Sequence, residues 1–281
     1  MGLFNNVSRP ILWVVEAQRC HMEEATYVRL GYIDPKATVF LLRVAFAFLA
    51  AASLFSLVAT LVYVKAANAA ATYVAALSTI INAVAAWHYN EIVKVRLGKP
   101  ISIESEWMID VLRHSDWAVT MPLLILKLYA LINNPEHDLI LGSVDASALC
   151  ACIMILLGAY SRLGLDELSN YEGLSRFGFL VGLASYAGSV ALLVLLLIDL
   201  VNAYSGVENT TLVFAFFLVW PCYALVAFTA VWFRQGVSDS TYPKYIALAK
   251  DLCFAALDVF SKAVFAWHTC SAAFGVQVLG S

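Results

Sequence analysis

The sequence carries little charge. Asp, Glu, Lys and Arg make up 13% of its 281 residues, whereas a soluble domain has roughly a quarter. Hydrophobic residues make up 62% of the chain, and the mean hydropathy is +0.80. This balance excludes an ordinary soluble domain. It indicates an integral membrane protein, and we expect it in the cell membrane, surrounded by the lipid bilayer.

Several other signatures are missing. The net charge is −3, so no nucleic-acid surface is expected. Residues 1–36 lack a basic start followed by an apolar core, which argues against a cleavable signal peptide. The six cysteines lie mostly in apolar runs, and Cys150 and Cys152 lack metal-site spacing, so no metal is expected. No nucleophile–base–orienter set stands out, and we do not expect an enzyme.

What the chain does contain is long apolar stretches. A membrane-spanning helix needs about 20 such residues, and seven stretches qualify: residues 37–64, 70–94, 106–132, 139–162, 176–201, 210–234 and 243–273. Turn-like connections are predicted at 133–135, 164–166 and 205–209. The prediction is an all-α membrane protein with one seven-helix bundle (37–281), after an N-terminal segment (1–36) in which residues 11–15 could lie along the interface.

The last stretch places Lys262 deep in an apolar run, one helical turn after Asp258. A free ammonium there is costly unless it is paired. A desolvated lysine is also the usual nucleophile for forming a Schiff base with an aldehyde. A purely structural Asp–Lys pair is the alternative, and this stretch alone does not decide between them.

The third stretch carries a row of titratable groups. Arg113, Asp116 and Thr120 are spaced by single turns, so the threonine hydroxyl could bond the carboxylate. Lys127 follows Asp116 by eleven residues, which is about 16 Å along the same face. Charged residues inside a membrane mark ion or proton pathways more often than they serve structure. Pro122 would interrupt the helical hydrogen bonding beside them.

Three motifs carry a family resemblance: Arg-x-x-Asp-Trp-x-x-Thr-x-Pro-Leu-Leu from Arg113, Asp-x-x-x-Lys from Asp258, and Trp-His-Tyr from Trp87. Together they resemble the microbial (type 1) rhodopsins, most closely the proteorhodopsin group, over nearly the whole chain from residue 37. A lone histidine in a membrane helix, such as His88, is more often a packing residue than a ligand. It would affect the proton affinity of Asp116 only if it faced that carboxylate.

The resemblance implies that Lys262 binds all-trans retinal as a protonated Schiff base. Asp116 and Asp258 would be the counterions, Asp116 also the proton acceptor with His88 as its partner, and Arg113 would balance charge. Leu124 stands at the group's colour-tuning position and implies green absorption. The retinal pocket would be lined by Tyr89, Trp117, Thr120, Leu124, Met154, Gly158, Phe217, Trp220 and Pro221.

The chain departs from the family pattern at several positions. Lys127 stands where a carboxylic proton donor is usual. An exiguobacterial branch has lysine there, which implies a donor role; the alternative is that Lys127 extends to the interface and donates nothing. Phe217 replaces a usual tryptophan, Trp220 a usual tyrosine, and Ala224 another aromatic residue, so the pocket wall is rearranged.

The family resemblance and the basic residues indicate opposite orientations of the chain in the membrane. The family places the N-terminus outside, but the basic residues at or beyond the ends of the predicted spans lie on the N-terminal side of the bundle, with only Lys65 opposite. They are Arg9, Arg19, Arg29, Lys36, Lys94, Arg96, Lys99, Arg162, Arg176, Arg234 and Lys244. Positive residues favour the cytoplasm. We follow the family, which makes outward transport the expectation and inward transport the consequence if the charge rule holds.

The sequence therefore predicts a retinal-binding, light-driven proton pump that forms a homo-oligomer, a pentamer or trimer. The rivals are a photosensory rhodopsin, a module of a larger assembly included, and a light-gated channel. A photocycle lasting seconds without net transport would mark the sensor, and a current that reverses with voltage would mark the channel.

Overall fold

The computed structural model describes residues 35–131, 141–167, 175–204, 219–227, 229 and 244–271. Its helices are α2 (Pro35–Lys65), α3 (Ala69–Gly98), α4 (Ile103–Ala130), α5 (Val144–Glu167), α6 (Ser175–Tyr204), α8 (Lys244–Asp258), the π-helical turn η2 (Val259–Val264) and α9 (Phe265–Cys270). Residues 219–227 are also helical. The predicted spans coincide with these elements, and the sixth is described only over 219–227.

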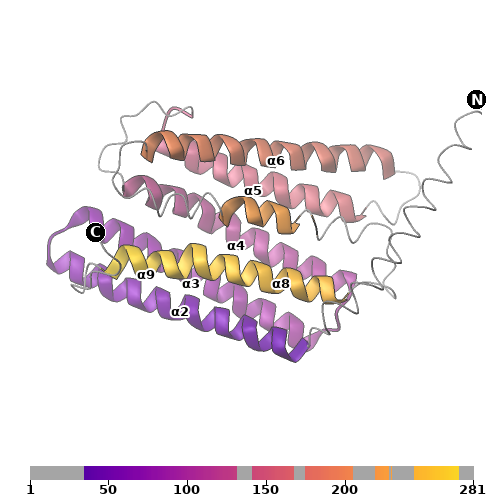
Figure 1. Ribbon diagram of the computed structural model, residues 1–281, viewed down its shortest axis with the longest axis horizontal. Helices are drawn as coiled ribbons and strands as arrows, with labels where there is room; N and C mark the ends of the chain where they lie inside the picture. The colour runs from indigo at the N-terminus through magenta and orange to yellow at the C-terminus, as the bar shows by residue number, and fades with distance from the viewer. Residues whose placement is uncertain are drawn as a thin grey trace, which may run out of the picture.

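The helices run side by side along one axis of the molecule (Figure 1). Consecutive helices from α2 to α6 pack on one another, and the last helix (α8, η2 and α9) returns to contact α2 and α3. The described residues thus form the all-α bundle that the sequence predicts. The segment 11–15 and the connections 133–135 and 205–209 lie outside the described residues.

The connection expected at 164–166 is wrong. Residues 164–166 are helical, because α5 continues to Glu167. A glycine within a helix costs only about 1 kcal/mol, and Gly164 is followed by leucine rather than by a second turn-forming residue. The helical hydrogen bonds therefore continue past the sequence signal.

Two tight connections join α2, α3 and α4. Asn68 caps α3, its side chain accepting a hydrogen bond from the Ala71 amide at 3.1 Å. Ala67 before it has φ 56°, in the left-handed region that a β-carbon disfavours. At the other end of α3, Ser102 and Ser105 form a capping box that begins α4. These caps hold α3 antiparallel to both neighbours.

Charged side chains lie inside the bundle beside an apolar core, and large apolar side chains cover its outer surface. Large hydrophobic side chains such as Phe40, Leu54 and Leu180 are exposed, while charged ones such as Asp116, Lys127 and Lys262 are buried. Among the described residues, four helices are long and apolar enough to cross a membrane: Lys36–Lys65, Ala69–Gly98, Val144–Ser161 and Leu180–Asn202. This distribution is the one expected of a chain surrounded by lipid.

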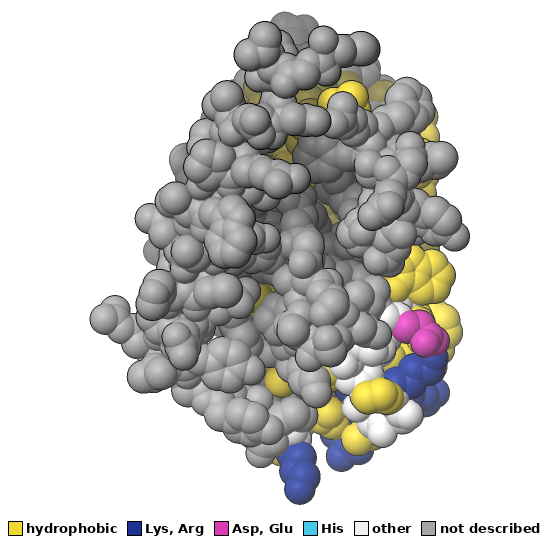
Figure 2. All heavy atoms as spheres, turned by 90° about the vertical axis from the view of Figure 1, so that its right-hand side faces the viewer, with side chains coloured by type: hydrophobic (Ala, Val, Ile, Leu, Met, Phe, Trp, Pro, Cys, Tyr) yellow, Lys and Arg dark blue, Asp and Glu magenta, His cyan; other side chains and the backbone are white. Residues whose placement is uncertain are grey.

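Figure 2 views the end of the bundle at the right-hand side of Figure 1. Described basic side chains gather there beside an acidic one. Lys99, just after α3, pairs with Glu104 in the first turn of α4 at 2.8 Å. This end, where α3 stops and α4 starts, is called the α3–α4 end below.

Candidate functional site

The centre of the bundle holds a lysine between two carboxylates. Lys262 Nζ lies 2.5 Å from Asp116 Oδ2 and 3.0 Å from Asp258 Oδ1. All three side chains are buried, with at most 2% of each exposed. The structure thus brings Asp258 and Lys262 of the last helix together with Asp116 of α4, which the sequence predicts to form one site. Two negative charges face one positive charge, so further donors are needed to stabilise the site.

Two tyrosines supply those donors to Asp258. Tyr89 from α3 donates its hydroxyl to Oδ2 at 2.8 Å, and Tyr223 donates to Oδ1 at 2.9 Å. The Tyr223 hydroxyl also lies 3.0 Å from Ser261 Oγ. Tyr89 was expected only to line a pocket, and Tyr223 was missed. The sequence signal for Tyr223 was its place among the aromatic residues around Pro221. The family pattern has its tyrosine at the position of Trp220, three residues earlier.

Asp116 is less completely bonded. Its Oδ1 has no hydrogen-bond partner among the described residues and lies 4.0 Å from His88 Nδ1. The His88 ring contacts the Val84 carbonyl at 2.9 Å through Nδ1 and Ser115 Oγ at 3.0 Å through Nε2. The His88 ring thus faces the Asp116 carboxylate at a distance too long for a hydrogen bond.

The hydrogen bond expected from Thr120 to the Asp116 carboxylate is wrong. Thr120 Oγ1 donates instead to the backbone carbonyl of Asp116, at 3.0 Å. Threonine in a helix commonly bonds the carbonyl one turn back, because that acceptor is fixed within reach. The hydroxyl is therefore engaged by the helix, and the free carboxylate oxygen keeps its capacity to accept a proton.

The lysine lies in a widened helical turn. Lys262 is inside η2, where the backbone changes to π-helical bonding. Such turns occur frequently at functional sites. Asn82 of α3, which is fully buried, reaches across to the Lys262 carbonyl with its amide nitrogen at 3.4 Å and also donates to the Ser78 carbonyl at 2.8 Å. Asn82 was missed by the sequence reasoning; the signal was an amide side chain in the middle of an apolar span.

Lys127 is buried, with 1% of its surface exposed. Its ammonium lies over the ring of Phe265, 4.0 Å from the centroid. No salt bridge to another described residue accompanies it. The alternative in which this side chain extends to the membrane interface is therefore excluded by its burial. The ring supplies a favourable face for the charge without removing its proton.

Arg113 does not reach the lysine site directly. Its Nη2 pairs with Asp251 Oδ1 at 2.8 Å, on the side of the α3–α4 end. Asp251 belongs to a larger buried set of charged side chains that sequence reasoning missed. The signal was present in part, since Glu106 and Asp110 precede Arg113 by seven and three residues on the same face of one helix.

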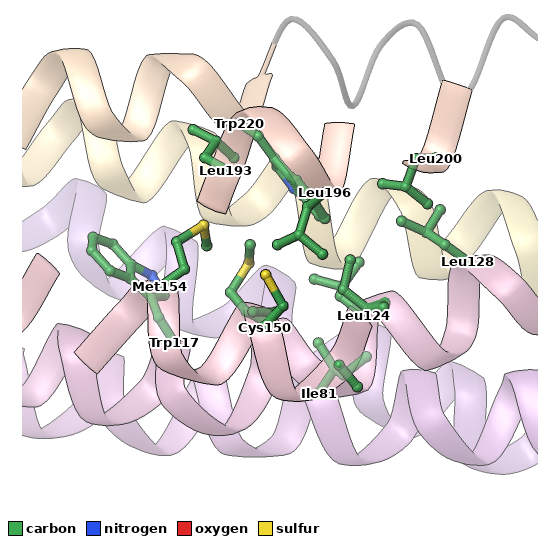
Figure 3. Packing of buried hydrophobic residues seen from close by; sticks show 14 of the residues in the cluster. Ile81, Trp117, Leu124, Leu128, Cys150, Met154, Leu193, Leu196, Leu200 and Trp220 are labelled. Carbon is green, nitrogen blue, oxygen red and sulfur yellow. The ribbon is translucent and has the colours of Figure 1, made fainter. Parts of the chain in front are cut away.

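The apolar part of the expected pocket lies beside the lysine site. Trp117, Leu124, Met154 and Trp220 belong to one buried cluster, with their side chains gathered between α4, α5, α6 and the helix at 219–227 (Figure 3). A β-carbon at Gly158 would lie 3.4 Å from Ser189 Oγ, so α5 and α6 approach closely there.

One expected pocket residue is placed differently, and another is not described. Pro221 is exposed, next to the buried Trp220. Phe217 lies outside the described residues. Ala224 is half-buried and packs against the same cluster. The wall opposite Trp117 is instead supplied by Tyr223, whose ring meets the indole edge-on at 5.3 Å between centroids.

These residues fit a long apolar aldehyde joined to Lys262. A buried amine stands at one end, with carboxylates to balance a charge on it, and aromatic and aliphatic side chains line the cluster beside it. The indole nitrogen of Trp117 is buried without a hydrogen-bond partner among the described residues. A fold of membrane-spanning helices around one such lysine defines a class of chromophore-binding membrane proteins.

The comparisons with known proteins agree with that class. A family model described as bacteriorhodopsin-like protein matches residues 37–275. The chain belongs to this family, whose members bind retinal, and it is an integral membrane protein. A search of curated proteins finds no match.

Solved structures of microbial rhodopsins share the fold at low identity. The rhodopsin of Exiguobacterium sibiricum is 20% identical, with a TM-score of 0.59, over 84% of this chain and 96% of that one. Xanthorhodopsin, a light-driven ion pump with a dual chromophore, is 19% identical, with a TM-score of 0.61, over 86% and 93%. A light-driven proton pump of Leptosphaeria maculans is 19% identical, with a TM-score of 0.59, over 88% and 98%.

Proposed function

We propose that this protein is a light-driven proton pump that binds all-trans retinal at Lys262. The observation that carries the proposal is the 2.5 Å contact between Lys262 Nζ and Asp116 Oδ2. It sets a proton-bearing nitrogen against a carboxylate that can take the proton. Condensation of the amine with the aldehyde carbon would form a carbon–nitrogen double bond and release water.

When bound, retinal supplies light absorption and a change of shape that alters the proton affinity at Lys262 Nζ. The two carboxylates beside this atom differ in their bonding. Asp258 accepts from two tyrosine hydroxyls, which stabilise its ionised form. Asp116 has one oxygen with no such donor among the described residues. Asp116 therefore accepts the proton, and Asp258 remains charged.

Lys127 returns a proton to Lys262 Nζ. Lys127 lies on α4 three turns after Asp116. Its ammonium contacts the ring of Phe265, which follows Lys262 by three residues in the last helix. The acceptor thus contacts the nitrogen of Lys262, and the donor stands about 16 Å farther along α4, away from the α3–α4 end. That arrangement lets a proton leave towards one end of the molecule and be replaced from the other, which a structural ion pair does not require.

Lys127→Ala is expected to slow the return of the dark-state absorption after a flash by about a hundredfold, the lower end for loss of a positioned proton donor. Flash spectroscopy of the purified protein measures it. Azide, a small mobile proton carrier, should restore the rate. The matched control is Lys65→Ala, which removes an exposed lysine at the end of α2. An unchanged recovery in Lys127→Ala would remove this residue from the mechanism.

The first functional test is the light-induced pH change of an unbuffered suspension of cells supplied with retinal. Acidification that a protonophore abolishes supports an outward pump, the direction we favour. Alkalinisation abolished in the same way supports inward transport and the orientation that the basic residues indicate. Coloured cells that give no pH change would contradict pumping and favour a sensor or a channel, which voltage-clamp currents would separate.

A further inference from the structure

A buried asparagine lies at a depth between the proton acceptor and Lys127. Asn82 of α3 is fully buried. It precedes His88, which faces Asp116, by six residues, or about 9 Å along α3 away from the α3–α4 end. Lys127 lies about 16 Å from Asp116 in the same direction along α4. A proton that passes from Lys127 towards the acceptor therefore has to cross the level of Asn82.

Two carbonyl groups fix the orientation of the Asn82 amide. Its Nδ2 donates to the Ser78 carbonyl at 2.8 Å and to the Lys262 carbonyl at 3.4 Å. If the amide were turned over, its oxygen would face both of these acceptors, which is unfavourable. Oδ1 is therefore the atom left over, and it is buried without a hydrogen-bond partner among the described residues. A buried acceptor of this kind is costly unless a donor binds to it.

The interval along α4 is apolar. Between Thr120 and Lys127 the residue on the same face is Leu124, which is 1% exposed. The Lys127 ammonium lies against the aromatic ring of Phe265, which offers a charge a favourable face but no lone pair. A proton crossing such an interval needs a polar atom on its way, and Asn82 Oδ1 supplies one.

Asn82 also lies beside the residue that needs the proton. Its amide contacts the backbone of Lys262, whose Nζ reaches back to Asp258, four residues and about 6 Å nearer the α3–α4 end. Phe265, which contacts the Lys127 ammonium, follows Lys262 by three residues in the last helix. Asn82 is therefore within one helical turn, along the last helix, of the residue that contacts the donor.

We propose that Asn82 is a positioning residue for the return of the proton: its amide oxygen holds a water molecule through which Lys127 protonates Lys262 Nζ. The inference rests on the proposed donor role of Lys127. Lys127 gives one proton to the water, and the water gives another to Lys262 Nζ, so Lys127 is left as a neutral amine and the water is restored. The amide oxygen accepts a hydrogen bond and orients the water without taking the proton itself.

A purely structural role for Asn82 is the alternative. The amide joins α3 to the last helix at the widened turn η2. Loss of that bond would disturb the backbone of Lys262 without any effect on proton delivery. The two roles use different atoms of Asn82, Nδ2 for the backbone contact and Oδ1 for the water. Variants that separate these two atoms decide between the roles.

The test compares Asn82→Val with Asn82→Thr by flash spectroscopy of the purified, retinal-loaded protein. The two replacements have nearly the same shape, and both lose the Nδ2 contact with Lys262, but only threonine keeps an oxygen that accepts a hydrogen bond. Asn82→Val should slow the return of the proton to Lys262 Nζ by about tenfold, the effect of one lost hydrogen bond. Asn82→Thr should stay within about threefold of the unmodified rate. The earlier loss of the proton to Asp116 should keep its rate in both variants.

Azide separates slow proton delivery from a disturbed backbone. It carries protons to Lys262 Nζ without the help of Asn82, so it should restore the rate in Asn82→Val. The matched control is Thr79→Val, on the same helix three residues earlier, where the lost hydroxyl donates to the Ala75 carbonyl at 3.0 Å. This variant should recover at the unmodified rate with and without azide.

Equal slowing in Asn82→Val and Asn82→Thr, or slowing that azide does not relieve, would overturn the inference in favour of the structural role. If Asn82→Val does not fold, Asn82→Leu keeps the branching of asparagine without its polar atoms and should show the same slowing, relieved by azide. An unchanged rate in the apolar variant, with Lys127→Ala slow and restored by azide, would contradict the inference alone. An unchanged recovery in Lys127→Ala would remove the donor and this inference with it.

Discussion

Lys262→Ala is expected to abolish the visible absorption of the protein supplied with all-trans retinal. Alanine has no amine, and the aldehyde would then have no buried nucleophile between Asp116 and Asp258. Without a charged nitrogen at the end of the polyene, free retinal absorbs in the near ultraviolet. The measurement is the absorption spectrum of purified protein after incubation with retinal in the dark.

The matched control for that experiment is Lys127→Ala, which removes another buried lysine of the same bundle. This variant should take on the colour of the unmodified protein, because Lys127 contacts Phe265 rather than the carboxylate pair. A coloured Lys262→Ala protein would overturn the central assignment. A colourless Lys127→Ala protein would show that loss of any buried lysine prevents folding.

Asp116→Asn is expected to abolish light-driven proton transport while leaving the protein coloured. Asparagine is similar in shape but cannot take the proton from Lys262 Nζ, and loss of a positioned proton acceptor slows such a transfer by about a hundredfold or more. Asp258 keeps one carboxylate beside the nitrogen, so the pigment should still form. Flash spectroscopy reports the loss of proton from the nitrogen, and the pH of a cell suspension reports transport.

The exposed carboxylate of Glu104 offers the comparison for this second substitution. Glu104→Gln should transport protons at the unmodified rate. Normal transport by Asp116→Asn would assign the acceptor role elsewhere, with Asp258 the remaining carboxylate in contact with Lys262. Loss of colour in Asp116→Asn would instead mean that both carboxylates are needed to hold a charged nitrogen at this depth.

Much of this arrangement is predictable from the sequence because it is local to a helix. The four-residue spacing from Asp258 to Lys262 and the row from Arg113 to Lys127 follow from helical periodicity alone. That the two rows meet is confirmed by the Lys262–Asp116 contact. Long apolar stretches likewise define the helices, since lipid demands internally bonded backbone.

The rest depends on how three helices are turned about their axes, which one sequence does not reveal. The buried ion pairs at the α3–α4 end need Arg96, Glu106 and Asp251 to point at one another from three helices. The role of Tyr223 depends on the local path of the backbone after Pro221. Arg96 is an example: its position in the sequence puts its charge among those that indicate a cytoplasmic N-terminus, yet its side chain is buried within the bundle.

The π-helical turn at Lys262 has a consequence for the last helix as a whole. Such a turn accommodates an extra residue, so the faces of α8 and α9 differ in phase by about 100°, the rotation of one residue. The half that carries Asp251 and Asp258 and the half that carries Phe265 are therefore set independently. Sequence changes at this turn would therefore rotate Phe265, which contacts Lys127, while Asp258 keeps its place beside Lys262. The last helix then behaves as two helices with separate orientations.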